Sequence, residues 1–171
     1  MVRWSIFAQM LPSTDKYVLL LGSDLGDREA NLRLALANIR EKIGAASETS
    51  NVHETDPWGF ESNTKFLNQA VLIETALSPE KMLDKLQSIE QDMGRVRTRT
   101  GYESRIIDID ILCSDKKMFS SERLSIPHEE LQTRAFALIP LCAIAGNWIH
   151  PTIGLTYSQI LARLQENVLI K

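Results

Sequence analysis

The stretch Arg105-Ile106-Ile107-Asp108-Ile109-Asp110-Ile111-Leu112 decides how the rest of this 171-residue sequence is interpreted. Its β-branched residues favour a β-strand. Because side chains alternate between the two faces of a strand, the isoleucines at 107, 109 and 111 share one face and the two aspartates share the other. The sequence therefore predicts a strand with one apolar face, suited to a core, and one acidic face.

The acidic face needs a partner, since carboxylates about 7 Å apart along a strand repel each other. Mg²⁺ removes this repulsion, because it prefers oxygen ligands and commonly binds one or two carboxylates together with substrate phosphates. Arg95, Arg97, Arg99 and Arg105 fall within a window of eleven residues just before the strand. The acidic pair and the arginine cluster together indicate a site for a polyphosphate with its metal ions. The alternative is an edge strand with solvated aspartates and a charged loop.

The bulk composition is that of a single globular domain. Apolar residues make up 44% and charged residues 24%, as in ordinary soluble proteins. The net charge of −3 argues against a nucleic-acid partner, so the arginine cluster suits a small anionic ligand. No stretch approaches the roughly 20 apolar residues of a membrane span. Residues 1–16 are expected to be an extension of unknown role without a signal-peptide pattern, and residues 17–171 a single domain.

The two cysteines, Cys113 and Cys142, have neither a metal-binding spacing nor a disulfide framework. Free, buried thiols are therefore expected. Such thiols are typical of a reducing compartment, so the sequence predicts a cytoplasmic location.

Apolar periodicity predicts the remaining elements. Residues 16–21 form a continuous apolar run that fits a central strand, and a helix is expected from the N-cap Asp27 to Gly44. Residues 47–55 and 66–75 alternate and are predicted as strands. A second helix begins after Ser78, with Pro79 in its first turn, and ends at Gly94.

The resulting order is βαββαβ, which predicts an α+β fold with a ferredoxin-like core. Such a core has a four-stranded antiparallel sheet with two helices packed on one face. C-terminal to this core, the sequence predicts a turn around Ile126-Pro127-His128, a helix near residues 133–145 and an amphipathic helix over about 157–164.

Seven short motifs, in chain order from about Tyr17 to Pro151, resemble the 6-hydroxymethyl-7,8-dihydropterin pyrophosphokinase family. They are Gly22-Ser23, Thr55-x-Pro57-x-Gly59, Phe66-Leu67-Asn68, Glu90-x-x-x-Gly94-Arg95-x-Arg97, Arg105-x-x-Asp108-Ile109-Asp110, Arg123-Leu124-x-x-Pro127-His128 and Arg134-x-Phe136. Each motif alone is weak, but the ordered set is specific. The resemblance implies Mg²⁺-dependent transfer of pyrophosphate from ATP to the pterin alcohol in folate biosynthesis, which gives the pterin diphosphate and AMP.

On the nucleotide side, the resemblance implies that Asp108 and Asp110 hold two Mg²⁺ ions on the ATP phosphates, in agreement with the strand argument. Arg95 and Arg105 would be the other catalytic residues and would bind the triphosphate through planar, charged donors. The further ATP-binding residues implied are Gln87, Glu90, Arg97, Tyr102, Ile111, Arg123, His128 and Arg134. Taken alone, His128 after a proline is more often a turn residue than a ligand contact.

On the pterin side, the resemblance implies that the rings of Phe66 and Phe136 sandwich the flat heterocycle. Asn68 shares a strand face with Phe66 and offers an amide donor and acceptor to the pterin edge. The loop residues implied at the same edge are Thr55, Pro57 and Trp58. Phe66 alone could equally be a core aromatic, but a polar Asn68 on its face favours a lined pocket.

The chain departs from the family pattern at a few positions. Asp24 stands where Asn is common, Phe66 stands where Tyr is common, and Gly101 and Glu103 interrupt the segment before the metal-binding strand. A monomer that binds only small molecules, without a nucleic acid or membrane, is expected. The alternative function is a ferredoxin-like domain that senses a nucleotide without turning it over. A sensor does not need two metal-facing aspartates beside a phosphate-binding cluster, which favours the enzyme.

Overall fold

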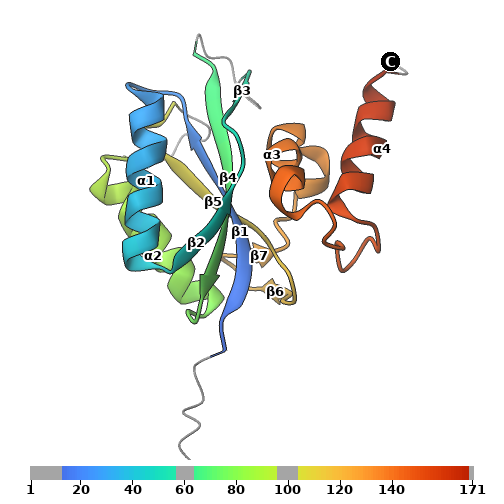
Figure 1. The fold of residues 1–171 in the computed structure, drawn as a ribbon, viewed down its shortest axis with the longest axis horizontal. Coiled ribbons are helices and arrows are strands. Elements are labelled where there is room, and N and C mark those ends of the chain that lie inside the picture. Colours follow the sequence, from blue (N-terminus) through green and yellow to red (C-terminus); the bar gives the residue numbers. More distant parts are fainter. Residues whose placement is uncertain (1–12, 57–63, 96–103, 170–171) are drawn as a thin grey trace, which may run out of the picture.

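A computed structural model describes residues 13–56, 64–95 and 104–169 of the chain (Figure 1). Its main sheet is antiparallel, with the strand order β2-β4-β1-β5, and β3 pairs with β4 beyond the end of β2. The strands are β1 (Asp15–Ser23), β2 (Ala45–Thr49), β3 (His53–Thr55), β4 (Phe66–Thr75) and β5 (Asp108–Ser114). This topology confirms the predicted ferredoxin-like α+β core.

Helices cover both faces of the sheet (Figure 1). Helices α1 (Arg28–Lys42) and α2 (Pro79–Asp92) pack on one face, as the βαββαβ order predicts. Helix α3 (Ala135–Ala145) packs on the opposite face against β4 and β1, and α4 (Tyr157–Leu169) packs against α3. The sequence predicts the two C-terminal helices but not that α3 covers the second face.

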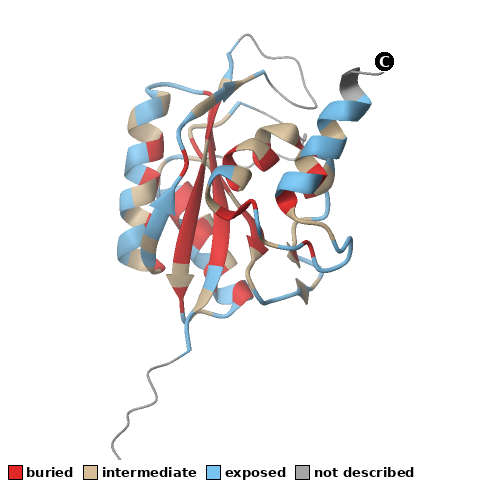
Figure 2. Ribbon diagram, turned by 45° about the vertical axis from the view of Figure 1, so that its right-hand side comes forward, coloured by how far each residue is buried: buried red, intermediate tan, exposed pale blue. Residues whose placement is uncertain are grey.

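The sheet therefore separates two apolar cores, and the central strands β1, β4 and β5 are mostly buried (Figure 2). In β4, Val71 and Ile73 face the core beneath α1 and α2, whereas Ala70 and Leu72 face the core beneath α3. Residues 107, 109 and 111 all lie in the first core, which confirms the apolar face predicted for β5. The acidic residues of β5 consequently face the side of the sheet that α3 covers.

The segment predicted as one strand over residues 47–55 is two strands, β2 and β3. The break lies at Ser50, which is buried. Its N–H donates to the Ala70 carbonyl oxygen at 2.9 Å, and its Oγ accepts from Ala70 N at 3.0 Å. The Ser50 side chain thus replaces one step of the β-ladder, and pairing with β4 resumes at His53.

The helix limits follow the predicted signals. Asp27 caps α1 by accepting from Ala30 N at 3.0 Å, and Gly94 ends the α2 segment with φ +92°. Gly44 is required by close contact, because a Cβ built there would lie 2.1 Å from the Glu74 carbonyl oxygen. Strand β1 begins at Asp15, two residues before the expected domain boundary. No helix within the described ranges is long and apolar enough to cross a membrane.

Between β5 and α3 the chain forms short elements that periodicity does not reveal. Strands β6 (Phe119–Ser120) and β7 (Ser125–Ile126) form a hairpin, the Ile126–Pro127 peptide bond is cis, and a 3₁₀ helix spans Leu131–Thr133.

Both cysteines are free, as predicted. Burial raises the pKa of Cys113 to about 12, whereas Cys142 is only partly buried.

Candidate active site

A pocket opens on the acidic face of the sheet, between the strand ends and the start of α3. It brings together four of the residues predicted for the pterin and both aspartates of β5. It is lined by Leu20, Gly22, Thr55, Asp56, Phe66, Asn68, Arg105, Asp108, Asp110, Arg134 and Phe136. We refer to it as the aromatic pocket, because the two phenylalanines belong to it.

Strand register builds the floor of the aromatic pocket. Gly22 of β1 pairs with Asn68 of β4 on one side and with Asp108 of β5 on the other. A Cβ built on Gly22 would lie 3.3 Å from Asn68 Oδ1 and 3.7 Å from the Phe66 ring. Glycine therefore leaves open the space between the polar amide and the carboxylate, where a flat ligand would fit.

The amide of Asn68 is oriented by its neighbour strand. Asn68 is 3% exposed, and its Nδ2 donates to Thr55 Oγ1 at 2.7 Å. Thr55 is in position because β3 pairs it with Phe66. With the amide nitrogen held in this way, Oδ1 faces the space over Gly22, where it can accept a hydrogen bond from a heterocycle.

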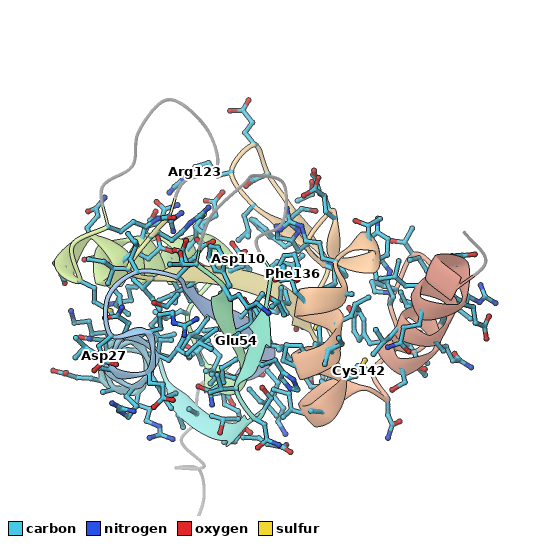
Figure 3. All side chains as sticks on the ribbon, turned by 90° about the horizontal axis from the view of Figure 1, so that it is seen from above. Asp27, Glu54, Asp110, Arg123, Phe136 and Cys142 are labelled. Carbon is cyan, nitrogen blue, oxygen red and sulfur yellow. The ribbon has the colours of Figure 1, made fainter. Side chains whose placement is uncertain are left out.

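Phe136 and Arg134 lie at the start of α3, across the pocket from β4. The guanidinium carbon of Arg134 is 5.8 Å from the centroid of the Phe136 ring, within the range of a cation–π contact. Seen from above in Figure 3, Phe136 lies beside Asp110, between the sheet and α3. The ring of Phe136 thus lines the same pocket as that of Phe66, and its stacking on a pterin stays a prediction.

Two arginines hold the carboxylate of Asp108. Arg95 Nη1 lies 2.5 Å from Asp108 Oδ1, and Arg105 Nη1 lies 2.8 Å from Asp108 Oδ2. Arg95 also forms an ion pair with Glu90. Burial acts to lower the pKa of Arg95, but the charges of Asp108 and Glu90 outweigh it and the pKa is raised. Arg95 and Arg105, the two described members of the arginine cluster, thus contact β5 in space as well as lying near it in sequence.

Glu90 lies beneath this cluster. It is 2% exposed, and its Oε1 accepts from Ile109 N at 2.8 Å while also bonding Arg95. It therefore ties α2 to β5 and orients the guanidinium of Arg95. Glu90 lines neither ligand pocket, so its predicted contact with the nucleotide stays a prediction and the structure shows a positioning contact instead.

The negative charge of Asp110 is unfavourable in this site. Burial, and next the charge of Asp108, raise its pKa from 3.8 to about 7. A bound cation would relieve this unfavourable charge, and an oxygen pair suits Mg²⁺. Among the described residues there is no group of three or more His, Cys, Asp or Glu that could hold a metal ion. Binding of Mg²⁺ by Asp108 and Asp110 stays a prediction.

A second pocket lies on the other side of Asp110 and contains several residues predicted for ATP. It is lined by Leu83, Ile109, Asp110, Ile111, Ser121, Glu122, Arg123, Leu124, Ser125, His128, Glu129 and Glu130. We refer to it as the hairpin pocket, because the β6–β7 hairpin forms much of its wall. Among the described residues, Asp110 is the one that lines both pockets.

Arg123 stands at the rim of the hairpin pocket, and Figure 3 shows it above Asp110. Its Nη2 donates to Asp84 Oδ1 at 2.7 Å and to Gln87 Oε1 at 3.4 Å. Both acceptors lie on α2, so Arg123 and Gln87 are neighbours, and their contact with the nucleotide stays a prediction. About half of each side chain in the Arg123–Asp84 pair is exposed (51% and 59%), so the pair can open for a nucleotide at small cost.

His128 is placed by backbone contacts next to the cis proline. Its N–H donates to the Leu112 carbonyl oxygen at 2.8 Å, and its Nδ1 accepts from Glu130 N at 3.2 Å. Burial, and then the charge of Arg134, lower the pKa of His128, so the ring is neutral at pH 7 and Nε2 carries the proton. His128 lines the hairpin pocket, and its contact with the nucleotide stays a prediction.

Four predicted site residues, Pro57, Trp58, Arg97 and Tyr102, lie outside the described residues. The structure adds Leu20, Gly22 and Asp56 to the aromatic pocket, which the sequence did not assign to a ligand. Gly22 could have been found, because it belongs to the Gly22-Ser23 motif and lies where a strand ends. No sequence signal marks Leu20 or Asp56.

Fold and site define the class: a ferredoxin-like α+β domain with a pair of carboxylates on β5, one of which, Asp110, lines two pockets. The chain belongs to the 7,8-dihydro-6-hydroxymethylpterin-pyrophosphokinase (HPPK) family, whose model matches residues 18–146. One relative is the 2-amino-4-hydroxy-6-hydroxymethyldihydropteridine pyrophosphokinase of Porphyromonas gingivalis, 40% identical over 136 residues, which cover 78% of this chain and 92% of the relative. The enzyme of the same name from Bacillus subtilis is 39% identical over 127 residues, 74% of this chain and 75% of the relative.

Solved structures agree on the fold. The Plasmodium falciparum protein HPPK-DHPS, in its wild-type form, aligns with a TM-score of 0.71 at 19% identity, over 91% of this chain and 46% of that one. Another HPPK-DHPS chain, solved in complex with substrates, aligns with a TM-score of 0.75 at 18% identity, over 93% of this chain and 45% of that one. The chain therefore spans less than half the length of these solved chains.

Proposed function

We propose that this chain transfers the pyrophosphoryl group of ATP to the hydroxymethyl oxygen of 6-hydroxymethyl-7,8-dihydropterin, a step of folate biosynthesis. Membership of the pyrophosphokinase family supports the reaction class and ATP as co-substrate. The observation that carries the proposal is the position of Asp110, which lines the aromatic pocket and the hairpin pocket at once. A group bound beside Asp110 and Asp108 would contact ligands from both sides.

The aromatic pocket is suited to the pterin and the hairpin pocket to ATP. Asn68 Oδ1 is free to accept from the pterin edge, and the Phe66 and Phe136 rings provide stacking surfaces. In the hairpin pocket, Arg123 and the Nε2–H of His128 are donors for phosphate or ribose oxygens. Each pocket thus offers the chemistry that one substrate requires.

In the reaction, the hydroxymethyl oxygen attacks the β-phosphorus of ATP. The bond from the β-phosphorus to the oxygen bridging the α-phosphate breaks, AMP leaves, and the hydroxyl proton is released. Asp108 and Asp110 would hold two Mg²⁺ ions, which neutralise phosphate charge when bound. Arg95 and Arg105, which hold Asp108 in the free chain, can turn to phosphate oxygens when the triphosphate arrives.

None of the pocket residues needs to act as a covalent nucleophile. Positioning of the two substrates and stabilisation of negative charge account for the chemistry. Glu90 contributes from below by keeping Arg95 and Ile109 in register. We further propose that the chain acts in the cytoplasm, which the two free thiols support and cell fractionation would test. We also propose that it acts as a monomer, which light scattering would test.

The product that ATP leaves behind tests this function. With Mg²⁺, ATP and the pterin alcohol, we expect AMP and pterin diphosphate in equal amounts by chromatography and ³¹P NMR, without ADP. A pterin with methyl in place of hydroxymethyl is the matched control and should give no AMP. ADP with a pterin monophosphate would contradict the proposal, and tight ATP binding without any turnover would identify a sensor.

A further inference from the structure

We propose that Asp24 is a positioning residue for the transfer reaction. Its buried carboxylate holds the backbone of Arg105 and thereby sets where the Arg105 guanidinium meets the reacting phosphates. Asp24 follows β1 directly and lines neither ligand pocket. This inference rests on the proposed function, because the placement of Arg105 matters for turnover only if a phosphate-bearing substrate binds beside Asp108.

The contact is reciprocal. Asp24 is 1% exposed, and its Oδ1 accepts from the Arg105 N–H at 2.6 Å. The Asp24 N–H in turn donates to the Arg105 carbonyl oxygen at 3.2 Å. Ser23 adds a third contact, from its Oγ to the Ile106 carbonyl oxygen at 2.5 Å. The end of β1 thus fixes both peptide groups of Arg105.

The segment that is fixed has no regular structure of its own. Residues 104–107 lie outside any helix or strand, and the β1–β5 ladder ends where Gly22 pairs with Asp108. From this segment the Arg105 side chain, 14% exposed, reaches Asp108 Oδ2 at 2.8 Å. Because a misplacement of about 1 Å can cost on the order of 100-fold in rate, the backbone contact bears on catalysis.

The arrangement is costly for stability, which points to a role beyond folding. Asp24 Oδ2 is buried and has no hydrogen-bond partner among the described residues. A nearby amide is directed elsewhere, since Asn31 Nδ2 donates to Ser23 Oγ at 3.1 Å and to the Leu25 carbonyl oxygen at 2.8 Å. A buried carboxylate oxygen without a partner destabilises the fold. Despite this cost, the buried carboxylate provides one interaction, the hydrogen bond that Asp24 Oδ1 accepts from the Arg105 N–H.

Three substitutions at Asp24 distinguish the effect of losing the hydrogen-bond acceptor from the effect of losing the negative charge. Asp24→Asn keeps an oxygen in the Oδ1 position, whereas Asp24→Ala removes it and the hydroxyl of Asp24→Ser is too short to reach. We expect Ala and Ser to lower kcat by about 10- to 100-fold, and Asn to stay within about threefold of the parent. The readout is steady-state AMP formation, with ATP and pterin KM determined separately.

Asp27→Ala is the matched control. It removes a nearby solvent-exposed contact, the N-cap hydrogen bond from Ala30 N, and such a loss generally costs about 1 kcal/mol of stability. Its kcat should not change, because Asp27 does not touch Arg105. If Asp27→Ala loses as much kcat as Asp24→Ala, the effect reflects general stability and the proposal fails.

A double-mutant cycle with Arg105→Ala gives the decisive readout. If Asp24 acts through the Arg105 guanidinium, Asp24→Ala should lower kcat by less than about twofold in that background. A full loss there, an unchanged kcat in the single variant, or an Asn variant as slow as Ala would each overturn the proposal. Should Asp24→Ala not fold, Ser and Asn decide it. Absence of AMP formation by the parent chain would instead overturn the proposed function.

Discussion

Ile109 and Asp110 are neighbours on β5, but the side chain of Ile109 lies in an apolar core and that of Asp110 lies in a charged site. Ile109 is 4% exposed and packs in the core beneath α1 and α2. Asp110 lies between the two ligand pockets on the other face, where burial and Asp108 raise its pKa to about 7. The comparison teaches that one face of the strand stabilises the fold by apolar burial. The other face destabilises it by burying a charge, at a place where a charged ligand is needed.

The largest effect is expected from Asp110→Ala. Loss of a metal ligand and of transition-state charge neutralisation should raise the barrier by about 3–4 kcal/mol, while pterin affinity changes much less. Stopped-flow turnover at saturating Mg²⁺ and calorimetric pterin titration measure the two quantities. Near-full turnover by this variant would rule out a metal at the acidic face.

Ile107→Ala reverses the pattern, because Ile107 lies in the same core as Ile109 and lines neither pocket. A cavity in the core should lower the free energy of unfolding by about 2–4 kcal/mol, as for other buried large-to-small changes. The kcat of the folded fraction, measured at low temperature, should stay close to that of the parent chain. Urea denaturation provides the stability. A kcat loss as large as that of Asp110→Ala would mean that the two faces are not separable.

Phe136→Ala tests the far wall of the aromatic pocket. Loss of a stacked ring should weaken pterin binding by about 1–3 kcal/mol and leave ATP affinity, measured without pterin, nearly unchanged. Phe119→Ala is the matched control, because that ring packs against the other core and lines a different surface. Equal loss of both ligands would make Phe136 a core residue and the stacking assignment wrong.

The smallest effect is a gain in stability from Asp110→Asn. A carboxyl whose folded pKa is raised from 3.8 to about 7 favours the protonated form in the fold. Its penalty is therefore absent below about pH 4, grows as the pH rises through this window and is complete above pH 7. In EDTA, Asp110→Asn should gain about 1–2 kcal/mol at pH 8 and little at pH 4.

Urea denaturation at the two pH values measures this gain. Asp108→Asn serves as the control, because Arg95 and Arg105 both bind that carboxylate and its neutralisation should destabilise the chain. A gain from Asp110→Asn of equal size at pH 4 and pH 8 would show that the charge of Asp110 is not the cause.

A continuous apolar run was enough to predict β1, and the alternation of apolar residues was enough to predict β4, β5 and the two faces of β5. These strands are long and packed on both sides, so their pattern is strong. The break at Ser50 was missed because a side-chain hydroxyl replaces a ladder contact without altering the alternation. The β6–β7 hairpin was missed because two-residue strands are too short to show a period.

The site was predictable where a motif carries chemistry. Asp108, Asp110 and the Phe66–Asn68 pair could be placed from spacing, and the structure brings them to one pocket. The burial of Glu90 beneath Arg95 and the role of Asp24 depend on contacts between distant segments, which spacing does not encode. That α3 closes the pocket follows from tertiary packing alone.

The central claim is that metal ions bind between the pockets, on Asp108 and Asp110, and join the two substrates. Anomalous diffraction from Mn²⁺ in crystals grown with a non-hydrolysable ATP analogue and the pterin alcohol tests it most directly. We predict two peaks, both ligated by these carboxylates, with the pterin between Phe66 and Phe136 and the nucleotide in the hairpin pocket. Peaks away from Asp110, or both ligands in one pocket, would contradict the account.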